Sequence, residues 1–198
     1  MKLLIFSDLQ GVDYREWSKL IEMSPSQYDA TILLGDIEDL FLKTIQERFS
    51  TKPLFGVLGN HDYEGDLEYF NIENIHGKRK EVNDTTFVGL KGSIRYKPGN
   101  FPMLTQAEAT IYCRSFDYAD IIISHNSPRG VHDKPDLAHK GFEGLTEYIQ
   151  VHQPRFALHG HQHKNQVTLL GNTTVVAVYG AIILDTETND IHQVLHIL

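Results

Sequence analysis

The feature of this sequence that most constrains its fold occurs five times: a short apolar run stops abruptly at a cluster of Asp, Asn, Gln or His residues. Short apolar runs bounded by turn residues are typical of buried β-strands. Because ligands bind at the carboxyl ends of strands in open α/β sheets, the clusters are predicted to meet at one edge and form a metal centre. The five runs with their clusters are Leu3–Phe6 with Ser7–Gln10, Thr31–Leu34 with Gly35–Asp39, Leu54–Leu58 with Gly59–Asp62, Ile121–Ile123 with Ser124–Asn126, and Phe156–Leu158 with His159–His163.

Helices are predicted between these strands. Residues 14–23 and 38–49 place apolar side chains at helical spacing between the first three strands, which predicts right-handed βαβ units in a parallel sheet. Further helices are predicted near residues 105–115 and 142–152, each of them before a strand.

The last third of the chain changes character. Short β-rich runs at residues 165–170, 174–178, 181–185 and 191–197 are separated by turn residues, which predicts a meander of antiparallel strands. The expected fold class is therefore α/β, with a four-layer α/β/β/α sandwich in which two mixed β-sheets are flanked by helices. We expect residues 1–198 to form a single domain.

Composition argues against several classes of protein. The 18 basic and 26 acidic residues give a net charge of −8, which disfavours a non-specific nucleic-acid binder, although bound divalent metals would restore positive charge where a phosphate binds. Cys113 is the single cysteine and cannot form an internal disulfide. The first apolar run is too short for a signal peptide, and no stretch reaches transmembrane length. We expect a cytoplasmic protein without a membrane partner, and the oligomeric state stays open.

Five motifs occur in a fixed order, each after a predicted strand. In this order the chain resembles the calcineurin-like metallophosphoesterases over nearly its whole length. The stretch from Ser124 to His163 is similar to the small bacterial, archaeal and phage members of that family. The motifs are Asp8-x-Gln10, Gly35-Asp36-x-x-Asp39, Gly59-Asn60-His61-Asp62, Ser124-His125 and Gly160-His161-x-His163.

The resemblance implies a centre of two divalent metal ions bridged by Asp36. Metal one would be bound by Asp8, Gln10, Asp36 and His163, and metal two by Asp36, Asn60, His125 and His161. Such carboxylate, amide and imidazole ligands suit Mn²⁺, Fe, Zn²⁺, Co²⁺ or Ni²⁺, and we expect Mn²⁺.

The resemblance also implies a mechanism. A water that bridges the two metals would attack the phosphorus in line with the leaving oxygen. His61 would donate a proton to that oxygen as a general acid, and Asp62 would hold the His61 ring.

Gln10 departs from the family pattern, which has His at this position. A glutamine oxygen is neutral and binds borderline metals less tightly than imidazole nitrogen. Either Gln10 still binds metal one and biases it towards Mn²⁺ or Mg²⁺, or metal one is weak and the protein is a poor catalyst. We favour the first alternative because every other ligand position is filled.

Two further residues are candidate substrate contacts, each with a simpler interpretation. His139 either reaches a substrate phosphate or merely precedes a helix. Arg95 is a candidate phosphate contact or an ordinary surface arginine. His159 is interpreted as a buried histidine whose hydrogen bonds are satisfied. The other histidines are interpreted as structural or surface residues, namely His76, His132, His152, His192 and His196.

The expected function is that of a metal-dependent phosphoesterase acting on a small phosphodiester or phosphomonoester. One alternative is a catalytically weak protein of this fold that serves as a binding or scaffold module, and a second is a nuclease. The nearly complete ligand set favours the enzyme, whereas only Gln10 favours the scaffold. The acidic balance and the lack of an added DNA-gripping domain disfavour the nuclease.

Overall fold

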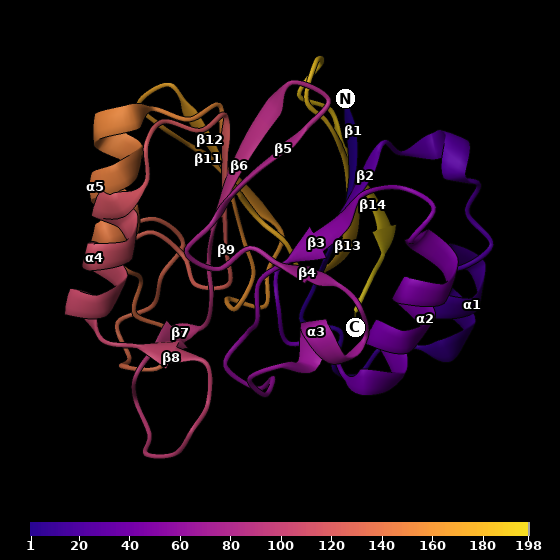
Figure 1. The fold of residues 1–198 in the computed structure, drawn as a ribbon, viewed down its shortest axis with the longest axis horizontal. Helices are drawn as coiled ribbons and strands as arrows, with labels where there is room; N and C mark the ends of the chain where they lie inside the picture. The colour runs from indigo at the N-terminus through magenta and orange to yellow at the C-terminus, as the bar shows by residue number, and fades with distance from the viewer. Residues whose placement is uncertain (198) are drawn as a thin grey trace.

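Two six-stranded β-sheets form the centre of the protein, in a computed structural model that describes residues 1–197 (Figure 1). The first sheet contains β1 (Lys2–Ser7), β2 (Ala30–Leu33), β3 (Leu54–Gly56), β4 (Glu73–Asn74), β13 (Gly180–Asp185) and β14 (Ile191–Leu195). The second contains β5 (Arg79–Val82), β6 (Thr85–Leu90), β9 (Ile121–Ser124), β10 (Phe156–His159), β11 (Gln166–Leu170) and β12 (Thr173–Ala177). A short separate pair is formed by β7 (Ser93–Ile94) and β8 (Met103–Leu104).

Both large sheets are mixed. The first has the order β14-β13-β1-β2-β3-β4; β1 to β4 run parallel, β13 is antiparallel to β1, and β14 is antiparallel to β13. The second has the order β11-β12-β10-β9-β6-β5, with a parallel centre and an antiparallel strand at each edge. The predicted pair of mixed sheets is confirmed.

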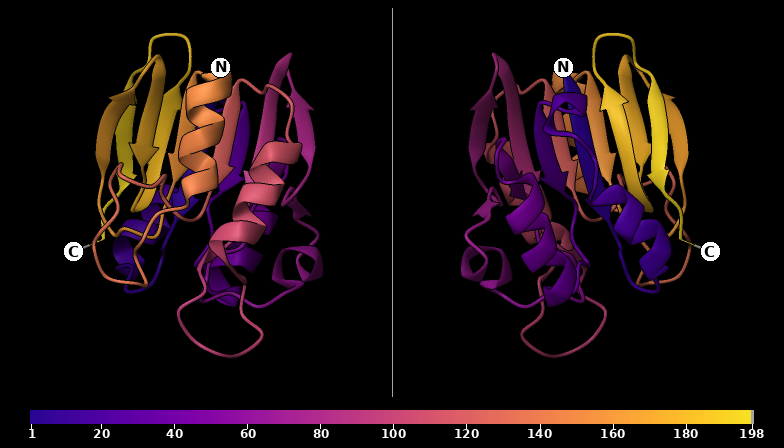
Figure 2. Two further views of the ribbon diagram at one scale, coloured as in Figure 1. Left: turned by 90° about the vertical axis from the view of Figure 1, so that its left-hand side faces the viewer. Right: turned by 90° about the vertical axis from the view of Figure 1, so that its right-hand side faces the viewer.

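Helices cover the outer face of each sheet, as Figure 2 shows. The first sheet is covered by α1 (Tyr14–Leu20) and α2 (Asp39–Phe49), with α3 (Asp66–Tyr69) and a 3₁₀ turn (Pro25–Gln27) nearby. The second is covered by α4 (Gln106–Ser115) and α5 (Glu143–His152). The four predicted helices are confirmed to within a few residues at their ends. Among residues 1–197, no helix is long and apolar enough to cross a membrane.

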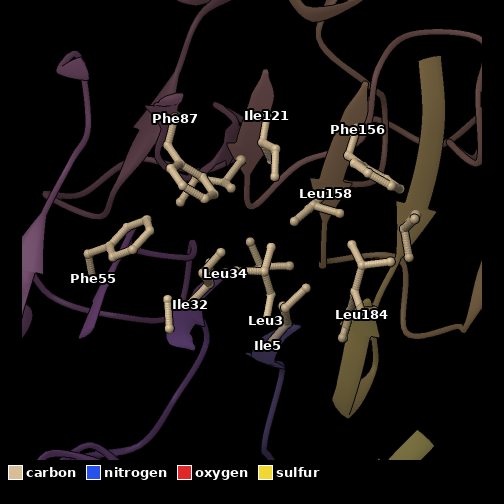
Figure 3. Close-up of a cluster of buried hydrophobic side chains, with 14 of the residues drawn as sticks. Leu3, Ile5, Ile32, Leu34, Phe55, Phe87, Ile121, Phe156, Leu158 and Leu184 are labelled. Atoms are coloured by element: carbon tan, nitrogen blue, oxygen red, sulfur yellow. The ribbon is translucent and has the colours of Figure 1, made fainter. Parts of the chain in front are cut away.

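The apolar runs are continuous because their strands are buried on both faces. In β1, Leu3 and Ile5 point into the core between the sheets, whereas Leu4 and Phe6 pack in the cluster beneath α1 and α2. Figure 3 shows side chains of the two sheets meeting in the inner core. The rings of Phe55 and Phe87, from opposite sheets, lie 5.1 Å apart edge to face. This burial holds the ends of β1, β2 and β3 against those of β9 and β10.

The predicted C-terminal meander is wrong in one respect. The strands form two antiparallel pairs, β11 with β12 and β13 with β14, but the pairs belong to different sheets. The chain crosses between the sheets at Val178–Tyr179, because β12 pairs in parallel with β10 whereas β13 pairs with all six residues of β1. Gly180 begins β13 with φ +92°, where a Cβ would lie 2.3 Å from the Leu195 carbonyl oxygen. It marks a crossing between the sheets rather than a hairpin.

Stability should depend on pH through His76. The backbone N–H of Lys91 donates to its Nδ1 at 3.3 Å, and its ring lies 4.4 Å from that of Tyr112. Burial, and then the charges of Lys91 and Lys78, lower the pKa of His76 from 6.5 to about 4. Between these values the unfolded chain binds a proton that the folded protein does not. The free energy of unfolding should therefore fall as pH falls through this window, by up to about 1.4 kcal/mol per pH unit.

Urea unfolding at several pH values between 4 and 7 measures this dependence. H76Q should have a shallower slope than the parent protein, and H196Q, at an exposed position, should keep the parent slope. Equal slopes for H76Q and the parent protein would show that His76 carries none of the dependence.

Candidate metal centre

The five predicted strand ends do meet, and backbone hydrogen bonds join them. The N–H of Asp8 donates to Gly35 O and that of Leu9 to Asp36 O, both at 3.0 Å, which joins the ends of β1 and β2. In the second sheet the N–H of Gly160 donates to His125 O at 3.0 Å. The two sheets then meet where the N–H of His161 donates to Asp8 Oδ2 at 2.9 Å.

The backbone at these ends is strained. Four of the seven predicted ligands have left-handed backbone conformations: Asp8 (φ 52°), Asp36 (φ 56°), His161 (φ 64°) and His163 (φ 50°). Non-glycine residues in this region cost on the order of 1–3 kcal/mol each, and they cluster at functional sites.

Two glycines of the motifs allow the carboxylates to approach the backbone. A Cβ on Gly59 would lie 2.1 Å from Asp36 Oδ1. A Cβ on Gly160 would lie 1.9 Å from Ser7 Oγ and 2.4 Å from Asp8 Oδ2. Glycine is therefore required in Gly59-Asn60 and Gly160-His161 by close packing against the carboxylates.

Each of the two central carboxylates has one fixed oxygen and one without a hydrogen-bond partner. Asp36 Oδ1 accepts from the N–H of His61 at 2.8 Å, whereas its Oδ2 has no partner. Asp8 Oδ2 accepts from Ser7 Oγ at 2.5 Å and from the N–H of His161, whereas its Oδ1 has none. Both residues are at most 1% exposed. Because a buried carboxylate oxygen without a partner is strongly destabilising, this pair fits bound cations.

Three imidazoles and an amide complete the cluster. Single ligand atoms of Asp36, His125 and His161 lie within 4.8 Å of one another. Nε2 of His125 is 3.4 Å from Asp36 Oδ2 and 3.1 Å from Asn60 Oδ1. Nε2 of His161 bonds to Ala138 O at 2.8 Å, which leaves its Nδ1 for a metal. Asn60, His125, His161 and Asp36 are the predicted ligands of metal two, and the structure brings all four together.

Two of the predicted ligands of metal one, Gln10 and His163, are less buried than the others. Nε2 of His163 lies 3.4 Å from Asp8 Oδ1, and the His163 side chain is 48% exposed. Its ring stacks on that of Tyr179 at 5.1 Å with 13° between the planes. Asn165 holds Tyr179 by two hydrogen bonds to its backbone, at 3.1 and 2.9 Å. Gln10 lies in the wall of the adjoining cavity with Asp36 and His61.

Asp36 and His125 strongly shift one another's pKa values. Burial lowers the pKa of His125, but the carboxylates of Asp36 and Asp8 outweigh it and raise this pKa to about 10. Burial raises the pKa of Asp36, but His125 outweighs it and holds this pKa below its usual range. Metals bind neutral imidazole, so a metal entering this site competes with the proton on His125.

His61 and Asp62 are adjacent in sequence, but His61 is exposed and Asp62 is buried. His61 is exposed and lines a cavity of about 290 Å³ together with Gln10, Asp36, Asp39, Tyr63 and Asp66. Its ring is free of the cluster, because only its backbone N–H contacts Asp36.

Asp62 does not hold the His61 ring as expected. Its carboxylate accepts from the backbone N–H groups of Gly59 (2.6 Å), Asp36 (2.9 Å) and Ile37 (3.1 Å). Burial and the Asp36 carboxylate raise the pKa of Asp62 to about 7, against the opposing effect of these donors. Asp62 therefore ties the loop after β3 to the loop after β2.

Of the two candidate substrate contacts, His139 lies against the metal cluster and Arg95 does not. His139 stacks on the His161 ring at 5.1 Å, and its Nδ1 is 2.8 Å from Asp136 Oδ1. The guanidinium of Arg95 donates to Met103 O at 2.8 Å and lies 4.0 Å from Glu108 Oε2. The structure thus gives Arg95 partners outside the metal cluster.

Sequence reasoning missed several residues that support the centre. Tyr179 lies beneath His163, and Tyr96 Oη accepts from Asn60 Nδ2 at 3.4 Å, which leaves Asn60 Oδ1 facing His125. His132 bonds to His159 at 2.9 Å, and His159 bonds to Gly160 O at 2.9 Å. The histidine pair gives His159 the satisfied bonds that were expected. No local motif marks Tyr179, Tyr96 or His132, since each contacts a residue that is distant in sequence.

Comparisons with solved structures show likenesses over nearly the whole chain. The protein TT1561 of Thermus thermophilus has a TM-score of 0.74 at 18% identity, and the match covers 96% of each chain. A novel archaeal phosphodiesterase has a TM-score of 0.59 at 16% identity, over 99% of this chain and 100% of its own. A dimetal phosphatase from Danio rerio has a TM-score of 0.60 at 12% identity, over 92% of this chain and 91% of its own.

At these identities the solved structures are evidence for the fold alone. The comparison with curated proteins found no match. The family model described as calcineurin-like phosphoesterase matches residues 1–165, a range that contains all five motifs. The chain therefore belongs to the calcineurin-like phosphoesterase family.

Proposed function

We propose that this protein is a metal-dependent phosphoesterase, working as one domain, that hydrolyses a small phosphodiester or phosphomonoester. The observation that carries the proposal is the pair of buried carboxylates, Asp8 and Asp36. Each has an oxygen without a hydrogen-bond partner, and the two carboxylates lie beside His125, His161 and His163.

The residues of the site are those that two divalent ions would need. The family uses a dinuclear metal centre. Asp36, Asn60, His125 and His161 would hold one ion, and Asp8, Gln10, Asp36 and His163 the other. When bound, such ions lower the pKa of a water and neutralise charge on the phosphoryl oxygens. We propose Mn²⁺ as the working ion, because neutral amide oxygens stand beside carboxylates in both sets.

His61 is the proposed proton donor to the leaving oxygen. Its backbone N–H is bound to Asp36, so the residue is fixed beside the centre while the exposed ring stays free of it. His61 lines the same cavity as Gln10 and Asp36. With His61 as the proposed proton donor, the leaving group would lie on this side of the centre.

A small substrate is favoured over a nucleic acid. The chain carries a net charge of −8, and the cavity beside His61 is lined by the carboxylates Asp39 and Asp66. Such a surface repels a polyanionic backbone. One archaeal relative is described as a phosphodiesterase and the Danio rerio relative as a phosphatase, so both ester classes belong in the test.

Hydrolysis of chromogenic phosphomonoesters and phosphodiesters with a panel of divalent metals tests the proposal. The protein should hydrolyse one class in the presence of Mn²⁺ and lose this activity with a chelator. D36N removes charge from the shared ligand and should be inactive. Protein that binds two ions but hydrolyses neither class at a rate above D36N would instead be a binding module.

Substitution of His61 should separate catalysis from metal binding. H61A should lower kcat by about 10²–10⁴-fold on an ester with a poor leaving group, because a general acid contributes this much. Metal content, measured by elemental analysis, should stay at the parent value, since no proposed metal ligand is removed. H192A, at an exposed position, is the matched control. An unchanged kcat for H61A would assign the proton donor elsewhere.

Gln10 is expected to make metal one the weaker of the two. Its amide oxygen carries no charge, and His163 on the same ion is 48% exposed. Q10H should tighten binding of one ion and shift its preference from Mn²⁺ towards Zn²⁺, Co²⁺ or Ni²⁺. Titration calorimetry with each metal measures both effects. If Q10H binds both ions with the parent affinity and preference, Gln10 is not a metal ligand.

A further inference from the structure

Four side chains form an aromatic rim beside the loop that carries Asn60 and His61. The rim consists of Tyr63, which follows that loop, and of Tyr96, Lys97 and Phe101 from the segment between β7 and β8. In Figure 1 this segment projects beyond the body of the molecule. The rings of Tyr63 and Phe101 lie 6.1 Å apart with 35° between their planes. A contact therefore links the projecting segment to the loop after β3.

The rim adjoins the metal centre on two sides. Tyr63 lines the same cavity as His61 and Asp36. Tyr96 Oη accepts from Asn60 Nδ2 at 3.4 Å. These contacts place an aromatic surface next to both a proposed metal ligand and the proposed proton donor.

The rim is also accessible and contains one cation, Lys97. The Tyr63 side chain is 64% exposed, although a large aromatic ring usually buries most of its surface. Nζ of Lys97 lies 4.2 Å from the Phe101 ring centre and 5.3 Å from that of Tyr96, within the range of a cation–π contact. Among residues 1–197, no carboxylate pairs with Lys97 within 4.0 Å, so its charge is available to a ligand.

We propose that the aromatic rim binds the leaving group of the substrate, and that this group is a planar aromatic ring carrying a negative charge. The proposal rests on the proposed function, because a proton donor at His61 places the leaving group on the side of Tyr63. The ring stacks on Tyr63 and Phe101. Its charge pairs with Lys97, the cation of the rim, whose Nζ lies 4.2 Å from the Phe101 ring centre.

The preference for a planar ring is tested with two esters whose leaving alcohols have similar acidity and size. Benzyl and cyclohexylmethyl esters, as monoesters or methyl diesters, differ mainly in the planarity of the ring. The Mn²⁺-loaded protein should have a kcat/KM about three- to tenfold higher for the benzyl ester, the effect expected of an aromatic pair. F101L and Y63L should bring this ratio close to one. Y69L, which removes an exposed ring packed on Phe70 outside the rim, should keep the parent ratio.

The charge is tested with the 4-carboxybenzyl ester. The parent protein should favour it over the benzyl ester, and K97Q should lose this preference while it still favours benzyl over cyclohexylmethyl. A parent protein that treats the charged and uncharged rings alike would overturn the assignment of Lys97.

Binding of non-hydrolysable analogues separates failure of this inference from failure of the proposed function. Calorimetry with benzylphosphonate and cyclohexylmethylphosphonate on the Mn²⁺-loaded protein should show the same preference for the planar ring, and F101L should lose it. Tight, ring-selective binding without turnover of any ester would contradict the enzymatic function but support the rim. Equal affinities, or a preference that survives in both F101L and Y63L, would overturn the rim as a binding site.

Discussion

The arrangement of the site depends on two buried carboxylates, Asp8 and Asp36, with no Lys or Arg side chain paired to either of them in the described part of the chain. Asp8 and Asp36 are at most 1% exposed, and each directs one oxygen that lacks a hydrogen bond into the cluster. Burying charge in this way is costly unless a counter-charge is supplied. His125 supplies part of this counter-charge, because the two carboxylates raise its pKa to about 10. Bound cations would supply the same compensation, and the surrounding imidazoles are arranged to share in binding them.

The fold stabilises this arrangement through backbone geometry more than through ion pairs. Asp8, Asp36, His161 and His163 adopt left-handed backbone conformations, and the glycines at positions 59 and 160 leave room for the carboxylates. Three backbone donors held by Asp62 tie the loops after β2 and β3 together. The large inner core, in which every central strand is buried on both faces, supplies the stability that offsets this local strain.

The sequence was sufficient to predict the sheets, the helices and the strand ends that meet, because each of these follows from local patterns. Apolar runs stop where metal-binding residue types begin, and the register of a buried strand leaves few alternatives. The C-terminal strands were assigned to one meander because hairpin signals do not say which sheet a strand joins. That choice is made by pairing between β13 and β1, at opposite ends of the chain.

The supporting residues of the site could not be predicted for the same reason. Tyr179 supports His163, and Tyr96 orients Asn60, through contacts that no local pattern encodes. Asp62 was expected to hold the His61 ring because the two are adjacent, yet its carboxylate turns towards the backbone of the loop after β2. Adjacent residues often point in different directions in a tight loop. A role that depends on the direction of a side chain therefore does not follow from the order of residues alone.

In the proposed metal centre, the ends of strands from both sheets hold two ions that share Asp36. Anomalous diffraction from crystals of the Mn²⁺-loaded protein measures this directly. Two peaks about 3.5–4 Å apart are expected. One should be surrounded by Asn60, His125 and His161, the other by Asp8 and His163, with Asp36 between them. A single peak, or two peaks without Asp36 as a common ligand, would contradict the account.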